Sequence, residues 1–167
     1  MSASTAENEL AQLLAPAFGR AAFRVHRNKP LIFICGGNNR GHRLALRHQF
    51  LGHIVVPSLR ILPVLAESAF PHQLIEGNLL NFEAFLADTA DCVLIFVESP
   101  GSIAETGLFA GRSRIAKKTL VVNMRSKSTN DSFLNLGPIK LIRRQSQFDT
   151  VFYLDKRKVT LWTCPHF

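Results

Sequence analysis

Two acidic side chains and several small polar ones stand together in residues 98–107, whose sequence is ESPGSIAETG. Pro100 and Gly101 turn the chain in this segment. A helix is predicted to begin at Ser102, which places Glu105 in its first turn. A carboxylate in such a position can stabilise positive charge on a substrate or attack an electrophilic carbon. The same spacing also fits a capping box, in which Ser102 and Glu105 only satisfy backbone donors.

Gly36 and Gly37 follow the apolar run at residues 31–35. These glycines can bring backbone amides close to a phosphate or a ribose hydroxyl. The spacing from Gly36 to Gly41 is that of a Walker A loop, but His42 and Arg43 stand where that motif has Lys and Ser or Thr. The sequence therefore argues against NTP hydrolysis. A plain tight turn explains the two glycines equally well.

The elements that position these loops follow from hydrophobic periodicity. Continuous apolar runs are typical of strands buried on both faces of a parallel sheet. Residues 60–65 form a weaker strand, which Pro63 would place at an edge or a bulge. Strands are predicted at 31–35, 92–97 and 119–123, and helices from about residue 41, over 75–88 and over 102–115. This alternation predicts an α/β fold: a three-layer, Rossmann-like parallel sheet flanked by helices, with both loops at one edge of the sheet.

The C-terminal part of the chain has a different pattern. Short apolar runs at 139–142, 150–154 and 159–162 are separated by basic residues, and we expect them to be strands. The sequence therefore divides into an α/β domain over 1–125 and a basic, β-rich extension over 126–167 that packs on the same domain.

Charge is unevenly distributed along the 167-residue chain, which has a formal net charge of +8. Residues 1–50 carry 7 basic and 2 acidic side chains, residues 51–110 carry 1 and 7, and residues 111–167 carry 12 and 3. The acidic middle indicates a carboxylate-bearing site. The basic flanks favour phosphorylated or polyanionic partners, including nucleic acid.

Cysteine usage and the apolar runs bear on the compartment. Cys35, Cys92 and Cys164 have no CxxC spacing, which favours a reducing compartment, and residues 1–20 lack a signal-peptide pattern. The longest apolar runs fall far short of the roughly 20 residues of a membrane span. We expect a cytoplasmic protein with no membrane partner. The six histidines form no HxxxH or HExxH pair, so we expect no metal site.

Five sequence features together resemble a known superfamily. They are the strand that ends in Cys35-Gly36-Gly37, the stretch NLLNFE at 78–83, Asp91 at the start of an apolar run, ESPGSIAETG at 98–107, and SFLNLGPI at 132–139. In combination they resemble the nucleoside 2-deoxyribosyltransferase-like superfamily, and within it the effector proteins encoded with bacterial retrons. The resemblance covers roughly residues 30 to 145.

The resemblance implies roles for individual residues. Glu105 matches the glutamate that attacks the anomeric carbon of the substrate, and Glu83 matches an acidic residue that helps bind the nucleoside. Ser99 stands where the family has an aspartate, a departure that bears on base specificity and transferase activity more than on bond cleavage. The predicted substrate-binding residues are Cys35, Gly36, Gly37, Arg40, Arg43, Asn78, Asp91, Glu98, Ser99, Gly101 and Ser102.

The function implied is that of an N-glycosidase that cleaves NAD or a related nucleotide or nucleoside, as the toxic component of a retron-type antiphage defence system. NAD or the nucleotide is then the substrate, and no cofactor is expected. A reverse transcriptase with its RNA-linked DNA is the implied partner, and a homo-oligomer is implied by analogy. The alternative is a Rossmann-like module that binds a nucleotide in the same cleft without cleaving it.

Overall fold

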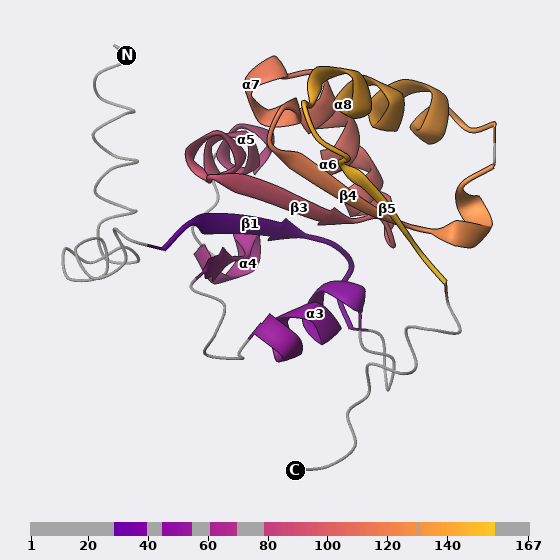
Figure 1. Ribbon diagram of the computed structural model, residues 1–167. Coiled ribbons are helices and arrows are strands. Elements are labelled where there is room, and N and C mark those ends of the chain that lie inside the picture. The colour runs from indigo at the N-terminus through magenta and orange to yellow at the C-terminus, as the bar shows by residue number, and fades with distance from the viewer. Residues whose placement is uncertain (1–28, 40–44, 55–60, 70–78, 130, 156–167) are drawn as a thin grey trace.

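A computed structural model describes residues 29–39, 45–54, 61–69, 79–129 and 131–155. Within these ranges five strands form one parallel sheet in the order β2-β1-β3-β4-β5 (Figure 1). The strands are β1 (Leu31–Cys35), β2 (Leu62–Val64), β3 (Cys92–Phe96), β4 (Thr119–Met124) and β5 (Val151–Leu154). The helices are α3 (Leu46–Ile54), α4 (Ala66–Ala69), α5 (Leu79–Thr89), α6 (Pro100–Ala110), α7 (Ser113–Ala116) and α8 (Lys140–Gln145), with a 3-10 turn at Arg125–Lys127 and a π-helical turn at Asn135–Ile139.

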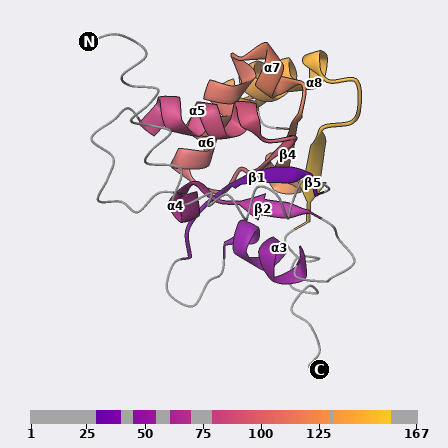
Figure 2. The ribbon, with the colours of Figure 1, turned by 90° about the vertical axis from the view of Figure 1, so that its left-hand side faces the viewer.

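Helices cover both faces of the sheet, so the predicted three-layer α/β architecture is confirmed (Figure 2). On one face Phe33 of β1 packs against Phe109 of α6, with ring centroids 6.2 Å apart. On the other face Phe96 of β3 packs against Phe50 of α3 at 5.5 Å. Alternate strand residues thus enter two separate apolar clusters, which explains why the strand sequences are continuously apolar.

The order of the strands creates a crevice at one edge of the sheet. The chain leaves β1 through α3 to reach β2 on one side, whereas β3 lies on the other side of β1 and continues through α6 to β4. The loops after β1 and β3 therefore diverge toward opposite faces. In open α/β sheets ligands bind at such a switch point, beyond the carboxyl ends of the strands.

The strands predicted in the first 125 residues are confirmed. Pro63 lies in β2, the outermost strand on its side of the sheet, where a missing backbone donor costs least. The helix predicted over 102–115 is two helices, because α6 ends at Ala110 and α7 starts at Ser113.

Among the described residues no helix is long and apolar enough to cross a membrane.

Residues 139–142 were predicted to form a strand, and this prediction is wrong because the segment is helical. Ile139 and Ile142 are 2% and 0% exposed, while the residues between them are exposed. A three-residue interval places both side chains on one helix face, in the same apolar cluster as Phe109. The predicted strand over 150–154 is confirmed as β5, and the strand predicted over 159–162 lies outside the described residues.

Candidate active site

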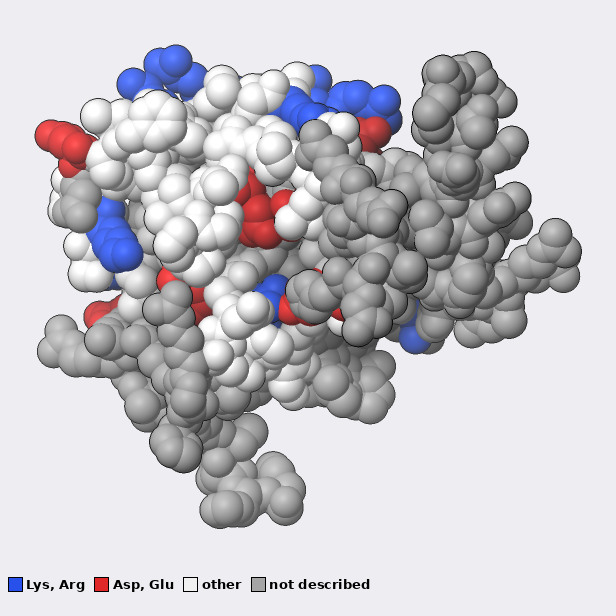
Figure 3. All heavy atoms as spheres, turned by 180° about the vertical axis from the view of Figure 1, so that it is seen from behind, with Lys and Arg blue, Asp and Glu red and all other residues white. Residues whose placement is uncertain are grey.

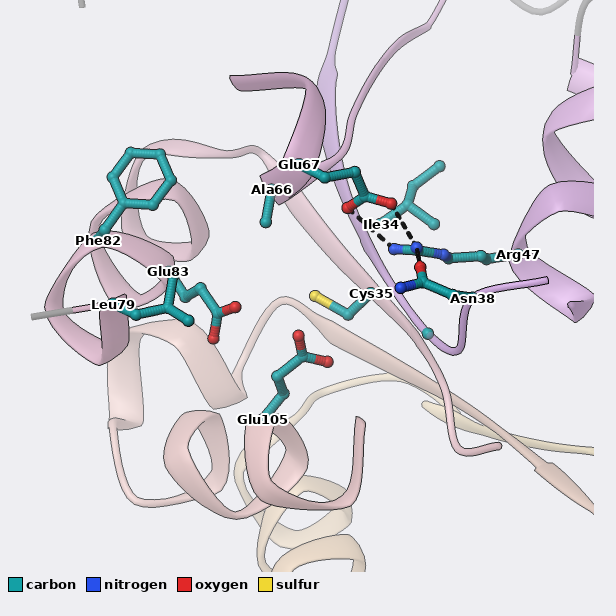
Figure 4. A pocket seen from close by; sticks show the side chains of 11 residues that line it. Ile34, Cys35, Asn38, Arg47, Ala66, Glu67, Leu79, Phe82, Glu83 and Glu105 are labelled. Carbon is teal, nitrogen blue, oxygen red and sulfur yellow. Dashed lines mark hydrogen bonds and ion pairs between the residues drawn. The ribbon is translucent and has the colours of Figure 1, made fainter. Parts of the chain in front are cut away.

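A pocket of about 260 Å³ lies at the switch point of the sheet. Its walls come from the carboxyl end of β1 and from α3, α4, α5 and α6. The polar side chains that line it come from six residues far apart in the sequence (Figure 4): Cys35, Asn38, Arg47, Glu67, Glu83 and Glu105. The structure thus brings together the two residues predicted to be catalytic.

Glu105 presents its carboxyl group to the pocket from the second turn of α6 (Figure 4). Its Oε2 atom is buried and has no hydrogen-bond partner among the described residues. Burial and the nearby Glu83 carboxylate raise the pKa of Glu105 to about 7; Arg47 opposes this shift. A carboxyl group in this state can exchange a proton or act as a nucleophile near neutral pH.

The cap of α6 explains why Glu105 is free to face the pocket. Ser99 is the N-cap residue, and its Oγ accepts a hydrogen bond from the backbone N–H of Ser102 at 3.2 Å. Ser102 completes the box, because its Oγ accepts from the backbone N–H of Ser99 at 3.0 Å. Pro100 then occupies the first helical position, where no backbone donor is needed. The interpretation of Ser102 and Glu105 as the capping box is therefore wrong.

Glu83 projects from α5 into the same pocket, toward Glu105 (Figure 4). Burial raises the pKa of the Glu83 carboxyl, and the carboxylate of Glu67 adds to the shift. Because two facing carboxylates repel each other, the pair tends to share one proton. Such a pair can supply an acid and a base, or a nucleophile and an acid, in one site.

Arg47 and Glu67 form the opposite wall of the pocket, and neither was predicted as a site residue. The Arg47 side chain is 5% exposed and forms an ion pair with Glu67, with Nη1 donating to Oε2 at 3.1 Å. Its Nη2 also donates to Oδ1 of Asn38. A buried guanidinium requires such partners. In the sequence, Arg40, Arg43 and Arg47 recur at intervals of three and four residues. This spacing was the only sequence feature that could have pointed to Arg47.

The carboxylate of Glu98, which is one of the predicted substrate-binding residues, binds the protein's own backbone. It accepts hydrogen bonds from the backbone N–H of Gly37 at 3.1 Å, of Leu46 at 2.9 Å and of Arg47 at 3.5 Å. A Cβ at Gly37 would lie 3.1 Å from Cγ of Glu98, so a larger residue there would require the Glu98 side chain to shift. The amide of Gly37 and the start of α3 are thus already occupied by a carboxylate.

Cys35 lies between the carboxyl groups of the pocket, at the end of β1 (Figure 4). Burial raises the pKa of the thiol well above its usual range, and the Glu105 and Glu83 charges add to the shift. The thiol is therefore protonated at neutral pH, and Cys35 forms a neutral part of the wall.

The remaining predicted site residues fall into three groups. Gly36 lines the pocket, whereas Gly101, Ser99 and Ser102 shape the start of α6 behind it. Asp91 lies at the amino end of β3, where its Oδ2 accepts a hydrogen bond from the backbone N–H of Leu31 at 2.8 Å. That end of the sheet is opposite the pocket, which argues against a role in substrate binding. Arg40, Arg43 and Asn78 lie outside the described residues.

No three His, Cys, Asp or Glu side chains of the described ranges are placed to hold a metal ion together. The polar side chains in the described lining of the pocket are three carboxyl groups, one guanidinium, one thiol and the amide of Asn38.

The fold and the pocket define an α/β protein with paired carboxyl groups at the switch point of a parallel sheet. The chain belongs to the STM3845 retron effector family, whose model matches residues 43–163. The predicted resemblance to retron effectors is thus confirmed, while the wider deoxyribosyltransferase-like relationship stays a prediction.

Two relatives from Escherichia coli match most of the chain. One is named "Retron Ec73 putative ribosyltransferase/DNA-binding protein"; it is 34% identical over 129 residues, which cover 71% of this chain and 40% of the relative. The other is named "Retron Ec86 putative ribosyltransferase/DNA-binding protein"; it is 29% identical over 136 residues, which cover 80% of this chain and 44% of the relative. This chain spans less than half of the length of either relative.

Proposed function

We propose that the pocket cleaves the N-glycosidic bond of NAD or a related nucleotide or nucleoside, as the toxic step of a retron defence system. The observation that carries this proposal is the carboxyl group of Glu105, which is buried in the pocket and faces Glu83, so that its pKa is raised to about 7. Membership of a retron effector family and the ribosyltransferase names of two relatives support it.

The chemistry of N-glycosidic cleavage suits these two carboxyl groups. As the bond from the anomeric carbon to the base nitrogen breaks, positive charge develops on the sugar ring. The ionised Glu105 carboxylate attacks the anomeric carbon, and the base departs with the electron pair of the broken bond. Water or an acceptor hydroxyl then attacks the same carbon and restores Glu105, while Glu83 accepts the proton of the attacking group.

The charge of the pocket favours a substrate with a cationic base. Among the described residues the pocket wall holds three carboxyl groups, those of Glu67, Glu83 and Glu105, and one guanidinium, which is paired with Glu67. The nicotinamide of NAD is positively charged before cleavage and neutral afterwards, so it leaves without an added proton. The carboxylates attract the positively charged base before cleavage, and this attraction is lost when the neutral base departs.

The size of the pocket limits which part of a dinucleotide enters it. Its volume of about 260 Å³ is below the roughly 300–1,000 Å³ of pockets that enclose a drug-sized ligand. We therefore place only the base and its ribose inside. The Gly37 amide, predicted to approach a phosphate, is engaged by Glu98, which leaves Gly36, Arg40 and Arg43 as the predicted phosphate contacts.

A substrate panel tests this function. The purified chain is incubated with NAD, NADP, nicotinamide riboside, and purine and pyrimidine nucleosides, and free base is separated by chromatography. We expect base release, fastest from a nicotinamide compound, and none from Glu105→Gln. Tight binding of a nucleotide without release, measured by calorimetry, would instead support a non-catalytic binding module.

A further inference from the structure

A second hollow, of about 560 Å³, lies on the other side of α5 from the candidate active site. Leu79, Phe82 and Glu83 face the active-site pocket, whereas Asn81 and Phe85 of the same helix line this hollow. Its far wall is formed by residues 112–115, at the start of α7. Nothing in the proposed glycosidase chemistry uses this hollow.

The hollow combines an exposed aromatic ring with exposed arginines. Phe85 is 43% exposed although it is fully apolar, and Arg112 and Arg114 stand beside it. The only acidic side chain in the lining is Asp88, which approaches Nε of Arg114 at 3.4 Å. The side chain of Arg114 remains 84% exposed despite this contact. An ion pair between such exposed groups is weak and can be displaced by another anion.

Basic side chains continue from this hollow over the neighbouring helices. α7 contacts both α5 and α8, so the surfaces of the three helices are continuous. Figure 3 shows Lys and Arg along its upper edge, where Figure 1 places α7 and α8, and acidic side chains in the middle of the face and near both upper corners. The exposed cations of these helices are Arg112, Arg114, Lys117, Lys140, Arg143 and Arg144.

We propose that this surface, the α5–α7–α8 face, binds single-stranded nucleic acid, with a base stacked on Phe85 and backbone phosphates on the arginines of α7 and α8. Proteins that bind single strands combine a basic track with exposed aromatic rings, and the described residues place both elements side by side here. A duplex keeps its bases stacked inside and cannot use Phe85 in this way. The proposal is independent of the role of Glu105.

Fluorescence anisotropy with labelled 20-nucleotide oligo-dT and oligo-U, and with a 20-base-pair duplex, tests the proposal on the 167-residue chain. The test variant is Arg112→Gln/Arg114→Gln. The matched control is Arg125→Gln/Lys127→Gln, which removes the same charge from exposed residues of the 3-10 turn. All variants are checked for folding by circular dichroism.

We expect the chain to bind oligo-dT or oligo-U, and to bind the duplex more weakly. The test variant should weaken binding roughly tenfold and reduce the slope of log affinity against log salt by about 1.4, or about 0.7 for each lost phosphate contact. The control should stay within about twofold of the parent. The difference between oligo-dT and oligo-U identifies which of the two nucleic acids is preferred.

Two single substitutions test the aromatic and acidic parts of the hollow separately. Phe85→Leu keeps an apolar side chain but removes the stacking face, so it should weaken binding of single strands several-fold and leave duplex binding unchanged. Asp88→Asn frees Arg114 and removes a charge that repels phosphate, so it should strengthen binding about threefold. Such an increase in affinity cannot result from partial unfolding of the variant.

Four results would overturn the proposal. These are an absence of binding at 50 mM salt, equal losses in the Arg112/Arg114 variant and its control, unchanged oligonucleotide binding in Phe85→Leu, and competition by polyglutamate as strong as that by oligo-dT. The last result would identify the surface as a site for an acidic protein segment.

Discussion

Glu105 of α6 and Glu83 of α5 point toward one another across the pocket, and the Glu83 charge adds to burial in raising the pKa of Glu105 to about 7 (Figure 4). The two residues lie on different helices, so the fold maintains this repulsion at the switch point of the sheet. Active sites commonly hold ionisable groups in environments that perturb their pKa values and lower the stability of the folded protein.

One consequence is that Glu105 destabilises the folded protein at neutral and alkaline pH. Its pKa is raised from 4.5 to about 7, so the folded state binds a proton more tightly than the unfolded state. The stability associated with that proton is present below pH 4.5 and is lost as the pH rises through about 7. Glu105→Gln should therefore raise the free energy of unfolding at pH 8 by roughly 2 kcal/mol.

Urea unfolding of the parent and Glu105→Gln at pH 4 and pH 8 measures this difference. The higher free energy of unfolding of Glu105→Gln at pH 8 should become smaller at pH 4, because the Glu105 carboxyl of the parent is then protonated and uncharged. An equal gain at both pH values would contradict the raised pKa, because it would reflect packing rather than charge.

The charged neighbours of Glu105 should shift its titration in opposite directions. Glu83 raises the pKa of Glu105 and Arg47 lowers it. Glu83→Gln should therefore move the acidic limb of the pH–rate profile to lower pH, and Arg47→Gln should move it to higher pH. Base release between pH 5 and pH 9 measures this limb; for an inactive variant, the pH dependence of the urea midpoint replaces it. Shifts of the same sign in both variants would refute the assignment.

Glu98 should matter for stability rather than for binding. Its carboxylate accepts backbone N–H groups from Gly37 and Leu46, which ties the loop after β1 to the loop after β3. Glu98→Gln replaces one accepting oxygen by an amide that cannot accept, so we expect a loss of about 1–3 kcal/mol in the free energy of unfolding. Chemical denaturation measures it. A variant as stable as the parent would show that these hydrogen bonds contribute little.

Much of the fold could be predicted because strands buried on both faces have continuous apolar sequences. The segments of β1, β3 and β4 are of this kind, and the chain that follows β1 and β3 leads to Gly36 and Glu105 of the pocket. The helix at Ile139 and Ile142 was missed because a short apolar run does not distinguish a strand from a buried helix by periodicity alone.

The candidate site was predictable only in part. Glu83 and Glu105 were found through the resemblance, whereas composition and spacing left Glu105 as an equally good capping residue. Arg47 and Glu67 were missed because their pairing depends on how α3 and α4 pack against β1, a long-range relationship that no local pattern encodes. The position of Glu98 depends in the same way on two loops about 60 residues apart, as the separation of 61 between Gly37 and Glu98 shows.

The most direct test of the account is the rate of nicotinamide release from NAD at pH 8 by the parent, Glu105→Gln and Asp91→Asn. Asp91→Asn is the matched control, because it makes the same chemical change in a carboxylate at the opposite end of the sheet. We expect release by the parent, a loss of at least about a hundredfold in Glu105→Gln and a change of no more than about twofold in Asp91→Asn. Release by a folded Glu105→Gln at the parent rate would contradict the assignment of Glu105 as the catalytic carboxyl group.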